Sequence, residues 1–255
     1  MILTDAIYGK KKGIINLTPA INQMGLSFWL ESQVQECFPQ QTPGTSINGP
    51  YPVYMNDLIT EGKTANISNA SGTDTVFTNE RAWGKPSNGT NFNIDGYYYL
   101  NANEDFTFGC FFKHKSPADS STGLFSNGIN TTDTGLGLIS LRPRIKISNI
   151  FILDAATGPQ LTQNDFTYVT LSIKSHIAGV QQGTYSVCYK GVEVYAGNHN
   201  RAMPSRDIRR LSDWYNPGNS TLGDYKSFHF YRRALTPTEN LENYNALLTA
   251  YNGII

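Results

Sequence analysis

The feature that most constrains the fold is a series of short segments in which apolar and polar residues alternate. In FTFGCFFK, residues 106–113, the first, third, fifth and seventh residues are apolar. Successive side chains of a β-strand point to opposite faces, so a period of two predicts a strand with one buried face. Residues 165–175 alternate in the same way, and in 224–233 the alternation places Phe228 and Tyr225 on opposite faces. The pattern predicts an all-β sandwich.

Turn residues separate these segments. In TYSVCYKGVEVYAG, residues 184–197, the pair Lys190-Gly191 interrupts two alternating runs and predicts the tight turn of a β-hairpin. Three further runs follow one another with Pro and Asn between them, and these predict meander strands over 136–141, 144–148 and 150–154.

The last segment changes period and predicts one short helix. Thr236 suits the N-cap, Pro237 the first helical position, and Glu239 completes a capping box. A helical stripe that would face a core then recurs at spacings of three, four and three, at Leu241, Tyr244, Leu248 and Tyr251.

Composition supports a single large β domain and restricts its partners. Hydrophobic residues make up 39% of the 255 residues and charged residues 16%, with 23 Gly and 12 Pro. The formal net charge is zero, which argues against binding to nucleic acid or to anionic membranes. No stretch has the roughly 20 apolar residues of a membrane span, and the first residues do not form a signal peptide. We expect a protein made in the cytoplasm, without membrane insertion.

Three cysteines, Cys37, Cys110 and Cys188, form no CxxC pair. They indicate neither a zinc site nor a disulfide framework, and we expect buried free thiols.

The first residues differ from the rest. A basic triplet at Lys10 to Lys12 precedes a stretch rich in Gln, Pro, Gly, Ser and Thr. We interpret 1–45 as an N-terminal arm and linker and 46–255 as the folded domain. The alternative is that the first segment adds a strand or two to the domain.

The order of these segments, from about residue 50 to 252, resembles the laminin G-like, concanavalin A-like jelly-roll domains, a group that includes the pentraxins. Five stretches carry the resemblance: 89–113, 124–128, 166–174, 185–195 and 222–247. The closing stretch YRRALTP departs from the pattern of the family by Arg232, and Lys190 replaces the usual Asn of the hairpin turn. The resemblance implies two antiparallel sheets packed face to face. It does not imply one chemistry, because this fold serves lectins, adhesion modules, glycosidases and structural proteins.

Glycosidases of this fold commonly place paired carboxylates on one strand, because two acids must flank the scissile bond. No such arrangement occurs at Glu61, Glu80, Glu104, Asp105 or Glu193. We therefore expect no catalytic residues and no enzymatic activity.

Calcium is the one cofactor that the resemblance suggests, since several relatives hold it with loop carboxylates. The candidate metal ligands, which lie in Gly- and Asn-rich turns, are Asp95, Asp213 and Asp224. Isolated Asp residues in turns also commonly bond to their own backbone, and that alternative stays open.

The loop 195–220 is the candidate ligand site. It combines aromatic faces that can stack on sugars with side chains that can bind hydroxyl or carboxylate groups. The candidate ligand-binding residues are Trp214, Tyr215, Asn216, His199, Arg201 and Arg206. In the alternative interpretation Trp214 packs beneath the loop and the arginines form a solvated rim.

Together these features favour a non-catalytic structural or attachment protein, displayed on a virion such as a bacteriophage capsid or tail. We expect partners among other virion proteins, self-association through the arm, and attachment to host surface polysaccharide. A glycan-active enzyme and a calcium-dependent lectin are the alternatives.

Overall fold

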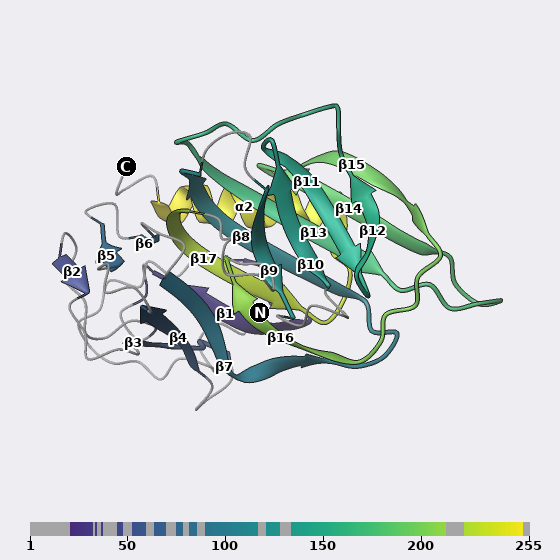
Figure 1. Ribbon diagram of the computed structural model, residues 1–255, viewed down its shortest axis with the longest axis horizontal. Helices are drawn as coiled ribbons and strands as arrows, with labels where there is room; N and C mark the ends of the chain where they lie inside the picture. Colours follow the sequence, from purple (N-terminus) through teal and green to yellow (C-terminus); the bar gives the residue numbers. More distant parts are fainter. Residues whose placement is uncertain are drawn as a thin grey trace, which may run out of the picture.

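The computed structural model describes residues 21–32, 34, 37, 45–47, 53–59, 64–69, 75–78, 82–85, 90–116, 121–127, 134–212 and 222–251. These residues form two antiparallel sheets and one C-terminal helix, as the sequence predicts (Figure 1).

The first sheet has nine described strands, and β17 lies in its middle with β1 paired along one part of its edge. In spatial order its strands are β15 (Val192–His199), β14 (Gly183–Tyr189), β13 (Phe166–Lys174), β8 (Phe106–His114), β17 (Gly223–Tyr231), β6 (Trp83–Lys85), β5 (Thr75–Phe77) and β2 (Thr45–Ile47), with β1 (Leu26–Glu31) beside β17.

The second sheet has eight described strands. Their spatial order is β12 (Ile150–Asp154), β11 (Arg142–Ile147), β10 (Gly135–Ile139), β9 (Ser121–Ser126), β16 (Arg206–Leu211), β7 (Thr90–Leu100), β4 (Thr64–Asn69) and β3 (Val53–Asn56). The described strand pairs are antiparallel, so the predicted all-β sandwich is confirmed.

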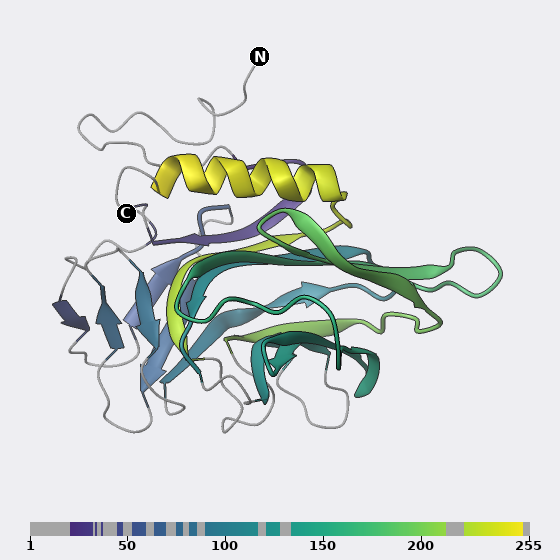
Figure 2. The ribbon, with the colours of Figure 1, turned by 90° about the horizontal axis from the view of Figure 1, so that it is seen from above.

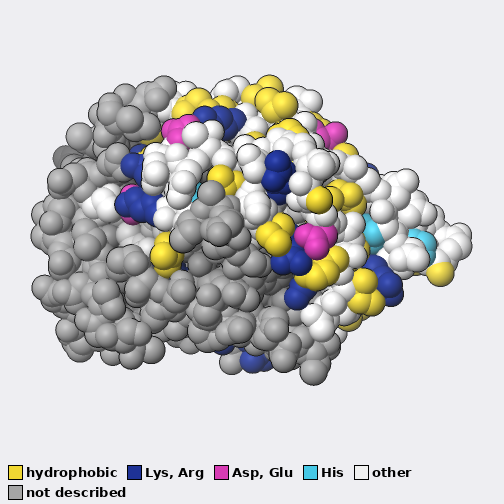
Figure 3. All heavy atoms as spheres, turned by 45° about the horizontal axis from the view of Figure 1, so that its top comes forward, with side chains coloured by type: hydrophobic (Ala, Val, Ile, Leu, Met, Phe, Trp, Pro, Cys, Tyr) yellow, Lys and Arg dark blue, Asp and Glu magenta, His cyan; other side chains and the backbone are white. Residues whose placement is uncertain are grey.

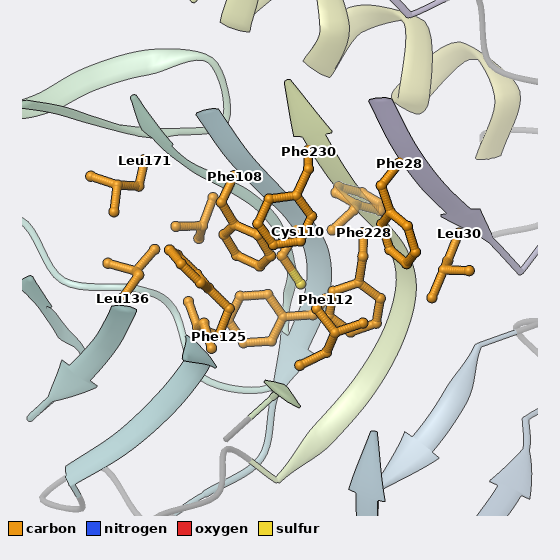
Figure 4. Close-up of a cluster of buried hydrophobic side chains, with 14 of the residues drawn as sticks. Phe28, Leu30, Phe108, Cys110, Phe112, Phe125, Leu136, Leu171, Phe228 and Phe230 are labelled. Carbon is orange, nitrogen blue, oxygen red and sulfur yellow. The ribbon is translucent and has the colours of Figure 1, made fainter. Parts of the chain in front are cut away.

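Aromatic rings fill the space between the sheets (Figure 4). Phe230 of the first sheet lies 4.9 Å from the ring of Tyr98 and 5.7 Å from that of Phe125, both of the second sheet. It also lies 5.1 Å from Phe108 on its own sheet. Because one ring contacts both layers, Phe230 joins the two sheets at the centre of the core.

The bulge in β17 changes one predicted orientation. The alternation placed Tyr225 opposite Phe228, but the pairing of β17 with β8 shifts between Tyr225 and Ser227. The extra residue lets Tyr225 point into the core, where it stacks on Phe112 at 5.6 Å. The prediction for Tyr225 was therefore wrong, because strict alternation fails across a bulge.

The central strands β8, β13 and β17 of the first sheet are buried on both faces, which the alternating pattern does not predict. The side chains of Tyr168, Thr170 and Ser172, expected to point outward, are at most 3% exposed. Helix α2 (Pro237–Tyr251) lies across this second face as a third layer (Figure 2).

The helix begins as predicted but buries only part of the predicted stripe. The capping box is confirmed, since Thr236 N donates to Glu239 Oε2 at 2.8 Å and Glu239 N donates to Thr236 Oγ1 at 3.3 Å. Of the predicted stripe, Tyr251 is buried and Tyr244 packs against the core, whereas Leu241 is 42% exposed. The other buried residues of the helix are Asn240, Asn243 and Leu247. Asn240 and Asn243 can face the sheet because each has a partner on it, Cys188 for Asn240 and Tyr231 for Asn243.

Directional contacts hold the helix there. Asn243 Nδ2 donates to Tyr231 Oη at 3.0 Å, and Tyr251 Oη donates to the buried carboxylate of Glu31 at 2.7 Å. The face beneath α2 therefore combines polar contacts with aromatic ones, since the ring of Phe111 also stacks on that of Tyr251 at 4.9 Å.

The predicted hairpin turn is present, and its glycine contacts the helix. Lys190 and Gly191 have φ angles of 51° and 78°, as a type I′ turn requires. A Cβ at Gly191 would lie 2.6 Å from the Cα of Leu241. Residue 191 must therefore be glycine, because its φ is positive and because a side chain there would clash with α2.

We expect Gly191→Ala to reduce the free energy of unfolding by about 2 kcal/mol or more, through backbone strain and the clash with α2. Gly179→Ala is the matched control, because Gly179 also has a positive φ, of 72°, but nothing lies within 4 Å of its added Cβ. Urea unfolding of both variants separates the two effects. Equal losses would show that the helix contact has no energetic role.

Part of the segment interpreted as an arm lies in the sandwich. β1 pairs with β17 from Leu26 to Glu31, and Trp29 packs against His229 with ring centroids 5.9 Å apart. Residues 26–31 thus form the additional strand that the sequence left as an alternative. Residues 1–20 lie outside the described residues, and the boundary at residue 45 stays a prediction.

All three cysteines are free and buried, as predicted. No helix among the described residues is long and apolar enough to cross a membrane.

Candidate functional site

The predicted ligand loop is described as far as Ser212. His199 ends β15, Arg201 follows it, and Arg206 begins β16. The side chain of Arg206 and the whole of three other predicted ligand residues lie outside the described residues, namely Trp214, Tyr215 and Asn216. Their contacts with a sugar stay a prediction.

The structure brings His199 and Arg201 together through the backbone. His199 is buried, its Nε2 lies 3.0 Å from the carbonyl oxygen of Lys174, and its Nδ1 accepts a hydrogen bond from Arg201 N at 3.2 Å. A neutral ring with its proton on Nε2 satisfies both contacts, and burial lowers the pKa of His199 in agreement. The ring of His199 therefore holds the start of the loop in place.

Asp224, the one predicted metal ligand whose side chain lies among the described residues, is far from His199. His199 pairs with Gly183 at one end of the first sheet, whereas Asp224 pairs with Lys113 at the other end. The strand β13 runs between these ends and is roughly 25 Å long, because a strand rises about 3.3 Å per residue.

Asp224 has a cationic partner. Its carboxylate lies 2.7 Å from Lys115 Nζ, and its side chain is only 6% exposed. The side chain of Asp95, in β7, and the whole of Asp213 lie outside the described residues. Among the residues that are described, no group of three His, Cys, Asp or Glu side chains could hold a metal ion. Calcium binding by these three aspartates stays a prediction.

A different group of side chains forms a compact surface on the hairpin of β11 and β12. We call it the β11–β12 surface, and it consists of Arg142, Arg144, Lys146, Phe151 and Asp154. β12 is the last described strand at its edge of the second sheet, and the ring of Phe151 is 40% exposed. Hydrophobic, cationic and acidic side chains adjoin one another on the described part of the face shown in Figure 3.

Arg144 is at the centre of this surface. Its Nη2 donates to Asp154 Oδ2 at 3.1 Å, and its Nε lies 2.9 Å from Asp154 Oδ1. The guanidinium carbon lies 4.3 Å from the ring centroid of Phe151, and Lys146 Nζ lies 4.8 Å from the same centroid. Ion pair and cation–π contact together fix the guanidinium between a carboxylate and a ring.

A tight turn and a bulge create this arrangement. Ser148 and Asn149 have φ angles of 50° and 61° and connect the two strands. The register then shifts, so that Lys146 pairs with Phe151 while Ile145 pairs with Leu153, which leaves Ile152 as the extra residue. Phe151 and Asp154 consequently share the outer face although they are three residues apart.

The chemistry of the surface suits a ligand with both apolar and hydroxyl-bearing faces. The exposed part of the Phe151 ring can stack on apolar C–H groups. The carboxylate of Asp154 is 46% exposed and retains acceptor positions beside its ion pair with Arg144. A rigid ring beside a fixed pair of donors and acceptors can both hold and orient such a ligand.

The sequence pattern does not predict this surface, for a geometric reason. Strict alternation places Phe151 and Asp154 on opposite faces of a strand, and no local signal marks the bulge at Ile152. The cations of RPRIKI, residues 142–147, do alternate, and together with the adjacent apolar pair Ile150-Phe151 they were the available signal.

No protein-family model and no curated protein matches the sequence. Solved structures do match. Trypanosoma rangeli sialidase in complex with the inhibitor DANA matches over 91% of this chain, with 14% identity and a TM-score of 0.57. The match covers 34% of the sialidase, so this chain spans about a third of that protein.

A second match is to a separate domain. It is domain 4 of AbnA, a GH43 extracellular arabinanase from Geobacillus stearothermophilus, in complex with arabinotriose. The match covers 87% of this chain and 99% of that domain. The identity is 13% and the TM-score 0.55. A SAP-like pentraxin from Limulus polyphemus matches over 56% of this chain and 70% of its own, with 13% identity and a TM-score of 0.42, which is too low to argue from. At these identities the likeness shows the fold alone.

The comparisons overturn one expectation. We expected no enzyme, because the acidic residues show no paired arrangement of carboxylates on one strand. The sialidase and the arabinanase, whose structures share this fold, are both enzymes. The fold therefore gives no ground for treating the chain as non-catalytic.

Proposed function

We propose that this chain is a carbohydrate-binding domain of a glycan-active protein and that the β11–β12 surface holds the sugar. The observation that carries the proposal is the half-exposed ring of Phe151 fixed beside the Arg144–Asp154 ion pair. An aromatic face supplies stacking on the sugar ring, and the ion pair supplies directional contacts to its hydroxyl groups.

The structural neighbours support carbohydrate binding as the general function. A domain of nearly the same extent as this chain is the one solved with arabinotriose, and the sialidase has been solved with sialic acid. These ligands belong to those proteins. Their relevance here is that domains of this architecture occur in glycan-active proteins.

The first test is the binding of oligosaccharides and polysaccharides by affinity electrophoresis. We expect Phe151→Ala to weaken binding at least 10-fold, because the stacking surface is removed, with little change in thermal stability. Val192→Ala is the matched control, since Val192 is a 61% exposed apolar residue on the edge of the other sheet. Unchanged binding by Phe151→Ala, with loss of binding in Trp214→Ala, would transfer the site to the loop 195–220.

A second candidate function is glycan hydrolysis, which is favoured by the two enzymes among the structural neighbours. Incubation with arabino- and sialyl-oligosaccharides, followed by chromatography of the products, tests it. Running the binding assay with calcium and with chelator tests the predicted site at Asp95, Asp213 and Asp224. Loss of binding on chelation would support the calcium-dependent lectin.

The remaining expectations are untested proposals. They are a place on a virion, assembly with other virion proteins, self-association through residues 1–45 and attachment to host polysaccharide. Size-exclusion chromatography with and without residues 1–20 would test the self-association.

A further inference from the structure

We infer that helix α2 covers an internal site that binds water, formed by the side chains of Tyr168, Thr170 and Asn240. The site lies on the face of the first sheet beneath α2, where the helix crosses the strands (Figure 2). The β11–β12 surface belongs to the second sheet, so the inference is independent of the proposed function.

Three polar side-chain atoms beneath α2 are buried without a hydrogen-bond partner among the described residues. They are Tyr168 Oη, Thr170 Oγ1 and Asn240 Oδ1, and all three residues are completely buried. A buried hydroxyl or amide oxygen that makes no hydrogen bond lowers the stability of a fold, so most such groups are paired with protein atoms or with ordered water.

The register of the sheet places these three atoms side by side. Thr170 pairs with Gly109 of β8 on one side and with Cys188 of β14 on the other. Tyr168 Oη lies over Gly109, because a Cβ added to Gly109 would be 2.6 Å from it. The amide of Asn240 lies over Cys188, because its Nδ2 donates to Cys188 Sγ at 3.6 Å. Thr170 is thus the middle of three neighbouring positions, which are about 4.8 Å apart.

The described groups around the site do not supply the missing hydrogen bonds. Thr170 Oγ1 is near the thiol of Cys188, which is only a weak partner. The amide of Asn243 is near Tyr168, but both of its ends are engaged by other residues, at 2.7 and 3.0 Å. His229 is on β17, two strands or roughly 10 Å from β13, so its ring does not bond to Thr170.

The chemistry of the site selects water. None of the three side chains is charged, and burial raises the pKa of Tyr168 well above its usual value, so the phenol keeps its proton. An ion would have no countercharge among these groups. The phenol and the hydroxyl of Thr170 can each donate and accept, and the amide oxygen of Asn240 accepts. These are the two to four polar partners that a buried water needs.

Thr170→Val tests the site, because valine has the shape of threonine without its hydroxyl. If water joins Thr170 to Tyr168 and Asn240, its loss leaves the other two groups buried without a partner. We then expect the equilibrium constant for unfolding to rise at least about 5-fold at pH 7.5, measured in urea. If the hydroxyl binds nothing, its removal is neutral or stabilising. An unchanged or smaller constant would therefore overturn the inference.

Thr167→Val is the matched control on the same strand. Thr167 is 4% exposed, and its Oγ1 also has no partner among the described residues. However, it is on the opposite face of β13, together with Val169 and Leu171 of the hydrophobic core. We expect the unfolding constant of Thr167→Val to change less than about 2-fold or to fall. An equal rise in both variants would show that the substitution itself, and not lost water, causes the effect.

Oxygen-17 magnetic relaxation dispersion detects the water directly, because it counts long-lived buried water molecules in solution. We expect Thr170→Val to hold at least one fewer than the wild type and Thr167→Val. Thr170→Ser, which keeps the hydroxyl, should hold the same number as the wild type. If Thr170→Val does not fold, Tyr168→Phe removes another polar atom of the site and should also lose water. Equal counts in the wild type and in the folded variant would overturn the inference, whatever its stability.

Discussion

The folded protein should lose about 4 kcal/mol of its free energy of unfolding between pH 7.5 and pH 5. The buried histidines His229 and His114 account for this loss, and His199, whose pKa burial also lowers, adds to it in the same direction. Burial lowers the pKa of His229 from 6.5 to about 3 and that of His114 from 6.5 to about 4. Because the unfolded chain takes up protons near pH 6.5 and the folded protein does not, stability falls as the pH drops below that value. His229 and His114 each contribute about 2 kcal/mol at pH 5.

His229 allows a clean test of this pH dependence. Neither of its ring nitrogens has a hydrogen-bond partner among the described residues, and the ring lies 5.9 Å from those of both Trp29 and Tyr168. We expect His229→Leu to be as stable as the wild type at pH 7.5 within about 1 kcal/mol, because no buried hydrogen bond is lost.

The same variant should lose only about 2 kcal/mol between pH 7.5 and pH 5, measured by urea unfolding at each pH. Glu239 acts in the same direction but at lower pH, because its ion pair with Arg233 lowers its pKa to about 2 and its contribution is lost only below about pH 4.5. An identical pH profile in His229→Leu and the wild type would contradict the assignment.

Phe230→Ala should reduce the free energy of unfolding by about 3 to 5 kcal/mol, which is much of the total for a typical domain. The reason is position. Phe230 contacts Tyr98 and Phe125 on the opposite sheet and Phe108 on its own sheet. Removing its ring therefore leaves a cavity between the two sheets. Urea unfolding at pH 7.5 measures the loss.

The control is Phe151→Ala, which removes the same number of atoms from a ring that is 40% exposed. We expect it to cost about 1 kcal/mol or less, since the site is open to solvent. If Phe230→Ala fails to fold, Phe230→Leu should still fold with a smaller loss. Similar losses at positions 230 and 151 would show that the aromatic contacts between the sheets do not stabilise the fold.

Much of the architecture follows from the sequence. Strands β8, β13, β14, β15 and β17 of the first sheet, the Lys190-Gly191 turn and the capping box of Thr236 and Glu239 were predicted from local rules, because each depends on neighbouring residues. Strands β1, β2, β5 and β6 of the same sheet were not predicted. The family resemblance supplied what local rules cannot, namely that these strands form two sheets. Arg232, which departs from the pattern of the family, has a structural explanation. Its guanidinium donates to both carboxylate oxygens of Glu104, at 2.7 and 2.8 Å.

The errors have a common cause, which is that backbone irregularities and a third layer leave little trace in the pattern of residues. Bulges reverse the side of Tyr225 and place Phe151 and Asp154 together. The buried stripe of α2 contains Asn240 and Asn243, which a search for apolar periodicity passes over. The bulge in β12 explains why the β11–β12 surface was not predicted. The polar residues on the buried side of α2 explain why the burial of the second face of the sheet was not predicted.

The polar contacts beneath α2 restrict how the helix docks on the sheet. Apolar surfaces can pack against one another in many neighbouring positions. A hydrogen bond from an amide to a phenol, or from a phenol to a carboxylate, forms in only one position. A helix attached through Asn243 and Tyr251 to Tyr231 and Glu31 cannot slide or roll by one residue without losing these partners. These hydrogen bonds thus fix α2 on the sheet in a single position.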